Sequence, residues 1–202
     1  MVLAGRVRAF YNRYPNVAPL AAGVGLFGLA DVVANRVENR FSDASVRFDP
    51  LRTAAVMGTA PFTNGGVLWF YRGVDAVCAG TSGARSVAQK VAIMTFVWNP
   101  VSVVSYTFIS TFFYCELTRL MPWASASDPA DGAGGVGSAA RAAAKVRANF
   151  VEAYTASFFL WPVSDALNFT IIQRAFSPHF RSTWDAFIGL IWNTSLLSRD
   201  AC

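Results

Sequence analysis

Long intervals of the chain contain no charged residue, and they set the first structural prediction. Such intervals run over 14–30, 53–71, 91–115 and 186–198, and a further one over 153–173 is interrupted only by Asp165. A helix needs about 20 mostly apolar residues to cross a hydrocarbon core of about 30 Å. Because strand-like alternation is absent and alanine is frequent, these intervals are expected to be helices rather than strands of a barrel.

The predicted fold class is therefore all-α, a polytopic membrane helical bundle of about four transmembrane helices plus a short C-terminal helix. The spans are placed near 17–35, 51–72, 88–116 and 147–173, and the short helix at 184–198. The 184–198 segment is compatible with a fifth membrane helix, an interfacial helix or a tail against the bundle. No connection requires a domain boundary, so residues 1–202 are expected to form a single membrane domain.

The composition supports this prediction and narrows the chemistry. Hydrophobic residues make up 54% of the chain and charged residues 14%, whereas soluble domains carry about 25% charge. The lone histidine, His179, excludes multi-histidine zinc sites and bis-histidine haem. Cys78, Cys115 and Cys202 form no C-x-x-C pair. We therefore expect no enzyme, no catalytic site, no metal and no cofactor.

The net charge of +5 is spread over every loop rather than gathered in one stripe, so nucleic acid is not an expected partner. The lipid bilayer is the expected one. Arg6, Arg8 and Arg13 precede the first acid, Asp31. An acid-free, arginine-bearing start resembles an organelle import segment, and it also suits an anchor among lipid phosphates.

Three prolines, Pro61, Pro100 and Pro162, fall inside three different predicted spans. Proline removes a backbone donor and kinks a helix. Three kinks either widen the bundle centre into a cavity or only shape the packing, and both interpretations stay open.

Asp165 is the most informative polar residue in a span, because a carboxylate at the bilayer midplane costs about 2.5–3.5 kcal/mol. Trp161, Asp165 and Asn168 share one helical face. The face serves either a polar path or ligand site, or an interhelical contact such as a pair with Arg72 or Arg174. The candidate polar-interior or pore-lining residues are Asp31, Asn64, Asn99, Ser102, Asp165 and Asn168.

Gly23, Gly25 and Gly28 fit the G-x-G-x-x-G pattern of nucleotide-binding loops. They lie within one apolar run, and no strand precedes them. The pattern therefore favours close packing of membrane helices through small residues, Ala18, Ala21 and Ala22 among them.

Several short motifs occur in an order that is similar to that of the motifs of a known family. They are Tyr14-Pro15, Ala30-Asp31, Asp49-Pro50-Leu51-Arg52-Thr53-Ala54, Trp69-Phe70-Tyr71, Lys90 with Pro100, Trp161-Pro162 with Asn168-Phe169, Phe180-Arg181 and Trp192-Asn193. The chain resembles the 22-kilodalton peroxisomal membrane protein family, which includes inner-mitochondrial members of the Mpv-seventeen type. It departs from the family pattern at Met94-Thr95, in place of Asp-Gln, and at Asp165, in place of Gln.

The resemblance implies a four-helix membrane protein of the kind described as a weakly selective channel, or tied to membrane integrity. We therefore expect an integral organellar membrane protein with a channel-like or membrane-integrity role for small solutes. The alternative is a non-catalytic accessory subunit of a larger mitochondrial membrane complex, such as a respiratory or ATP synthase assembly, or association with itself. The mitochondrial inner membrane is the expected location because the N-terminus lacks acids and the C-terminus lacks a peroxisomal tail. The peroxisomal membrane is the alternative.

Overall fold

The structure, a computed structural model, describes residues 2–41, 48–121, 123 and 137–197, and every regular element in these ranges is helical. The elements are α1 (Val2–Arg13), α2 (Val17–Phe41), α3 (Pro50–Val77), α4 (Gly83–Ile93), η1 (Met94–Trp98), α5 (Asn99–Leu120), α7 (Ser138–Leu167), η3 (Asn168–Ile172), α8 (Gln173–Ala175), η4 (Pro178–Phe180) and α9 (Arg181–Leu197). The predicted all-α class is confirmed for this part of the chain.

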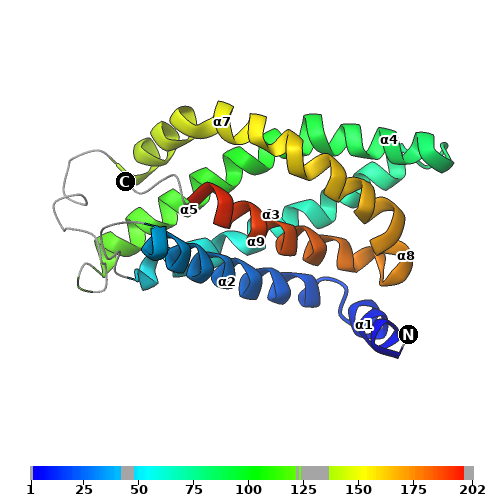
Figure 1. Cartoon of the computed structure of the whole chain (residues 1–202), viewed down its shortest axis with the longest axis horizontal. Helices are drawn as coiled ribbons and strands as arrows, with labels where there is room; N and C mark the ends of the chain where they lie inside the picture. The colour runs from blue at the N-terminus through cyan, green and yellow to red at the C-terminus, as the bar shows by residue number, and fades with distance from the viewer. Residues whose placement is uncertain (1, 42–47, 122, 124–136, 198–202) are drawn as a thin grey trace.

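The long helices lie side by side as an up-and-down bundle (Figure 1). Helices α4, η1 and α5 follow one another without a break, and so do α7, η3 and α8. We call the end that holds α1, the α3–α4 turn and the η3–α9 connection the α1 end. The C-terminal end of α2, the first turn of α3 and the start of α7 lie at the opposite end (Figure 1).

Each predicted span lies on a helix, but the helices are longer than the spans. Among the described residues, two stretches are both long and apolar enough to cross a membrane, Val17–Glu38 and Gly83–Leu120. The charge-free part of α3 carries glycine, threonine and asparagine, and that of α7 carries serine, threonine and Asp165. These polar and small residues lower the hydropathy of α3 and α7 below that of the other two.

Helix α9, which contains most of the predicted 184–198 segment, packs against the other long helices. It runs along α2 and also contacts α3 and α7 (Figure 1). Ala186, Ile188 and Gly189 are buried in these contacts. Helix α9 is therefore a full member of the bundle.

The three prolines differ in their surroundings. Pro61 and Pro162 lie inside α3 and α7, as expected. Pro100 lies in the first turn of α5, directly after the wider π turn of η1. Proline lacks the N–H that would bond four residues back, and its ring clashes with that carbonyl. A wider turn at this point accommodates both effects.

Small residues bring α2 and α3 into close contact. A Cβ atom on Gly23 would lie 1.6 Å from Asn64 Nδ2, and one on Gly28 would lie 2.9 Å from Met57 Sδ. A Cβ atom on Gly25 would meet nothing within 4 Å. The glycine pattern lies within helix α2. Of the glycines predicted to serve packing, Gly28 does and Gly25 does not, and Gly23, which was not among the predicted packing residues, makes the closest approach.

Replacing Gly23 by alanine should therefore destabilise the bundle by about 1–3 kcal/mol, the usual cost of overpacking. Gly25→Ala is the matched control, and its higher helix propensity should leave stability equal or up to about 1 kcal/mol greater. Thermal unfolding of both variants in detergent measures the difference. Equal melting temperatures for the two variants would contradict this packing account.

Candidate functional site in the buried polar interior

A hydrogen-bonded group of three buried side chains joins α3, η3 and α9 near the α1 end. The hydroxyl of Tyr71 donates to Asp185 Oδ2 at 2.5 Å. The amide Nδ2 of Asn168 lies 2.8 Å from the Tyr71 hydroxyl and 3.0 Å from Asp185 Oδ1. Asn168 is completely buried, and Tyr71 is 1% exposed. We call Tyr71, Asn168 and Asp185 the interior triad.

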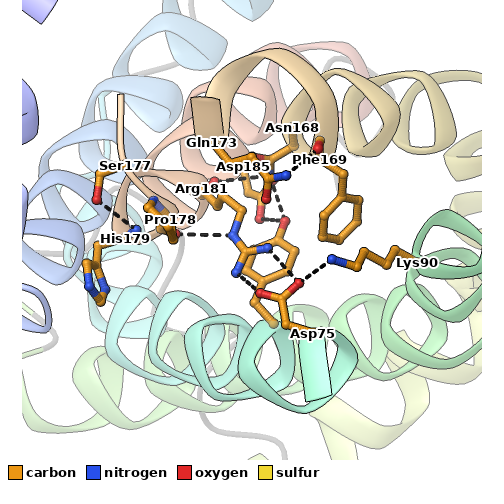
Figure 2. Close-up of polar contacts among 11 residues, drawn as sticks. Asp75, Lys90, Asn168, Phe169, Gln173, Ser177, Pro178, His179, Arg181 and Asp185 are labelled. Atoms are coloured by element: carbon orange, nitrogen blue, oxygen red, sulfur yellow. Dashed lines mark hydrogen bonds and ion pairs between the residues drawn. The ribbon is translucent and has the colours of Figure 1, made fainter. Parts of the chain in front are cut away.

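An ion cluster covers the interior triad toward the α1 end (Figure 2). The guanidinium of Arg181 holds both oxygens of Asp75, with Nη2 at 2.5 Å from Oδ2 and Nη1 at 3.3 Å from Oδ1. Lys90 Nζ lies 2.6 Å from Asp75 Oδ1. The Arg181 guanidinium also lies 4.5 Å from the centre of the Tyr71 ring. The cluster thus links α3, α4 and α9.

Asp165 lies beside the interior triad but joins none of its hydrogen bonds. It is 1% exposed, and neither of its carboxylate oxygens has a hydrogen-bond partner among the described residues. Its carboxyl group is close enough to Asp185 and Tyr71 to interact with them electrostatically. A buried carboxylate without a partner is costly, so Asp165 is a site where water, a proton or a solute is needed.

A second buried polar group closes the opposite end of the bundle. Arg52 Nε lies 2.9 Å from Asp31 Oδ1, and Arg52 Nη1 lies 3.1 Å from Glu38 Oε2. The Thr53 hydroxyl donates to Asp31 Oδ2 at 2.6 Å. Asp49 caps the start of α3 and accepts a hydrogen bond from the Tyr114 hydroxyl at 2.6 Å. These contacts join α2, α3 and α5.

Between the two ends, buried polar side chains lie in the middle of the bundle. The amide nitrogens of Asn64 and Asn99 and the hydroxyl of Thr95 are buried without a hydrogen-bond partner among the described residues. Ser102 is only half-buried, and its hydroxyl donates to the backbone carbonyl of Asn99 at 3.0 Å.

The structure therefore separates the sequence-predicted residues into three levels. Asp165 and Asn168 come together, and their face contacts α9, where the Trp161 and Trp192 rings lie 6.4 Å apart. Asp31 lies at the other end, and Asn64, Asn99 and Ser102 lie between.

The predicted pairing of Asp165 with an arginine is wrong for Arg72 and is not seen for Arg174. Arg72 is exposed, donates to Asn16 Oδ1 at 3.1 Å and lies over the Trp69 ring. Arg174 is exposed. Arg181 is the buried arginine of this region, and it forms its ion pair with Asp75 rather than with Asp165.

Sequence reasoning missed Tyr71, Asp75 and Asp185 as interior groups. One signal was available, because Arg181 and Asp185 are one helical turn apart at the start of a charge-free run. Two charged residues that are four positions apart lie on the same face of a helix.

The comparisons with known proteins bear directly on this region. A sequence model described as the Mpv17 / PMP22 family matches residues 136–197, which hold Asp165, Asn168, Arg181 and Asp185. A protein of Dictyostelium discoideum named PXMP2/4 family protein 2 is 21% identical over 96% of this chain and 89% of its own length. No solved structure matches the chain significantly. Both matches support an assignment to the Mpv17/PMP22 family, whose model covers the C-terminal part of the chain. The family resemblance stated from the sequence motifs is thereby confirmed for this part.

Two titratable groups near the α1 end have shifted pKa values. Partial burial and the cations Arg72 and Arg181 lower the pKa of His179. Burial raises the pKa of Asp75, but the hydrogen bonds and charges of Arg181 and Lys90 outweigh it and lower the pKa overall. The His179 ring points away from the ion cluster (Figure 2), and no group of three or more potential metal ligands occurs among the described residues.

Asp75→Asn should destabilise the protein by about 1–3 kcal/mol, because Arg181 is 3% exposed and would lose its anionic partner, while the partly exposed Asp75 side chain reduces the loss below that of a fully buried pair. Glu116→Gln is the control, since the Glu116–Arg119 pair is largely exposed and should change stability by less than about 1 kcal/mol. Unfolding by titrated denaturing detergent compares the two. Equal losses would show that Asp75 is no more important than a surface acid.

Proposed function

We propose that the bundle crosses an organellar membrane through α2, α3, the η1–α5 helix and α7, with α9 packed among them in one membrane domain. Large apolar side chains are exposed on every one of these helices, among them Leu29, Phe62, Val101, Phe159 and Ile191. In water such a surface would be unfavourable, whereas lipid matches it. The helical rise of 1.5 Å per residue puts Thr53 and Tyr71, at the two polar ends, about 27 Å apart along α3. That separation is close to the hydrocarbon thickness of a bilayer.

Within that membrane domain, the proposed function is the passage of small polar solutes and water through the bundle interior. The observation that carries it is the set of buried polar groups without hydrogen-bond partners at all three levels. Among the described residues outside the groove between α4 and α7, they are Arg52 Nη2 and the Thr118 hydroxyl, then Asn64 Nδ2 and Asn99 Nδ2, then the Asp165 carboxyl, Asn168 Oδ1 and the Ser182 hydroxyl.

Each such group left dry costs about 1–3 kcal/mol. Buried waters usually satisfy groups of this kind. A row of such groups from one end of the bundle to the other favours a hydrated path that includes the carboxyl group of Asp165. Asp31, by contrast, is held by Arg52 and Thr53 and closes one end of the path.

The mitochondrial inner membrane is the proposed location, and the peroxisomal membrane is the alternative. The contacts of helix α1 favour a role of the acid-free N-terminus as an anchor at the membrane interface rather than as an import segment that is removed. Its Tyr11 hydroxyl lies 2.9 Å from Thr183 Oγ1, and Asn12 Oδ1 accepts from the Ser177 hydroxyl at 2.9 Å. These contacts hold α1, with its exposed Arg6 and Arg8, against the start of α9.

An accessory role in a larger membrane complex, or self-association, is the second candidate. The exposed aromatic side chains Phe96, Phe158 and Phe159 support it, because aromatic residues are enriched where proteins meet. Migration of the mildly extracted protein as a lone small particle on a native gel would count against this candidate.

Purified protein in liposomes should raise the permeability to glycerol above that of empty liposomes, as measured by light scattering during osmotic swelling. Asp165→Leu should lower the added permeability about tenfold, the factor for one lost solvent interaction of ~1.4 kcal/mol. Phe159→Leu, at a lipid-facing position that is 84% exposed, should leave it unchanged. Wild-type liposomes no more permeable than empty ones would refute the permeation role.

A further inference from the structure

A groove of about 1000 Å³ runs between α4–η1 on one side and α7–η3 on the other. It lies outside the path described above. We propose that this groove binds a phospholipid with an anionic headgroup, held as a specific ligand. The proposal rests on the membrane placement proposed for the bundle and is independent of solute passage.

The groove changes from polar to apolar along its length. At the α1 end it is lined by Ser82, Gly83 and Arg174, and at its other end by Phe96 and Phe158. Ser82 and Phe96 are about 21 Å apart at the helical rise of 1.5 Å per residue. The polar end coincides with the level of the ion cluster, where the hydrocarbon of the membrane ends. A ligand that fits is therefore amphipathic and has its polar group at the α1 end.

The charge at the polar end selects an anion. Lys90 and Arg174 line the groove, and none of its lining residues is acidic. The first turn of α4 also faces this end, and its N-cap residue Ser82 makes no side-chain cap hydrogen bond. Unfilled N–H groups at a helix start attract phosphate oxygens. Because Lys90 is already paired with Asp75, Arg174 is the cation with most freedom to meet a phosphate.

Thr95 provides an independent indication of a ligand. It lines the groove, is 4% exposed, and its hydroxyl has no hydrogen-bond partner among the described residues. A helical threonine usually bonds a carbonyl in the preceding turn, but Thr95 lies in the π turn η1 and does not. It lies about 7.5 Å deeper along the helix than Lys90. At this depth the ester carbonyl of a phospholipid, below its phosphate, would accept a hydrogen bond from the Thr95 hydroxyl.

The deep end of the groove suits an acyl chain. Phe96 is 63% exposed and Phe158 is 40% exposed, with their ring centres 5.8 Å apart. Pro162 and Val91 complete this apolar part. A free phosphate would leave it unused, whereas the acyl chain of a phospholipid would cover it.

The test is native mass spectrometry of the full chain in detergent, with phosphatidylglycerol and phosphatidylcholine of identical acyl chains added as separate probes. Phosphatidylglycerol should be retained with about tenfold higher affinity. Arg174→Gln should weaken its retention about fivefold, the factor for one cation near a lipid surface. Arg147→Gln is the matched control, because Arg147 is an exposed cation toward the other end of the same helix.

Two further variants separate the groove from general surface charge. Ala92→Phe places a ring in the groove from an exposed position and should reduce the retention of both lipids. Thr95→Val should reduce the retention of phosphatidylglycerol and of phosphatidylcholine equally, because both lipids carry the ester carbonyl that accepts the hydrogen bond of Thr95.

Equal effects of Arg174→Gln and Arg147→Gln, or lipid retention unchanged by Ala92→Phe, would overturn the proposal. Displacement of phosphatidylglycerol by inorganic phosphate alone would show a simple anion site instead and would also overturn it. These measurements need no transport activity, so a failure here is distinct from a failure of solute passage.

Discussion

The side-chain amide of Asn168 is the point on which the arrangement of the helices depends. It donates to Tyr71 on α3 and to Asp185 on α9, and it is completely buried. The same amide also lies 3.4 Å from the backbone carbonyl of Arg181. These contacts hold η3, α3 and α9 in one register. Arg181 and Asp75 then add an ion pair over the same junction. The α1 end is thus organised by polar contacts, whereas the middle of the bundle packs through glycine.

This arrangement accounts for the uneven apolar character of the helices. Helix α3 contacts α2, α5 and α9 and contributes to both polar ends, so it carries small and polar residues. The continuous stretch Gly83–Leu120 is little buried and contains a long charge-free, mostly apolar part between Lys90 and Glu116. The residue types of a membrane helix depend on what each face contacts. A face in contact with lipid carries large apolar side chains, and a face in contact with another helix carries small or polar ones.

The positions of the helices could be predicted from the sequence because charge-free intervals reflect the one requirement that lipid imposes on every span. The shared face of Trp161, Asp165 and Asn168 followed from helical periodicity. The partners of that face could not be predicted. Tyr71 and Asp185 are distant in sequence and look like an interfacial aromatic residue and a helix-end acid. The packing of α9 back against η3 and α7 brings Asp185 to Asn168.

Lys90 connects the interior to the membrane surface. Its ammonium pairs with Asp75 in the ion cluster, lies 5.4 Å from the centre of the Phe169 ring, and lines the groove between α4 and α7. An anion in the groove would compete with Asp75 for this ammonium. Asp75 would keep Arg181 as its partner, so the cluster would loosen at α4 without losing its link to α9. Phe169, beside Asn168, packs against both cations and the Tyr71 ring. A lipid in the groove is therefore in physical contact, through Lys90 and Phe169, with the residues that surround Asp165.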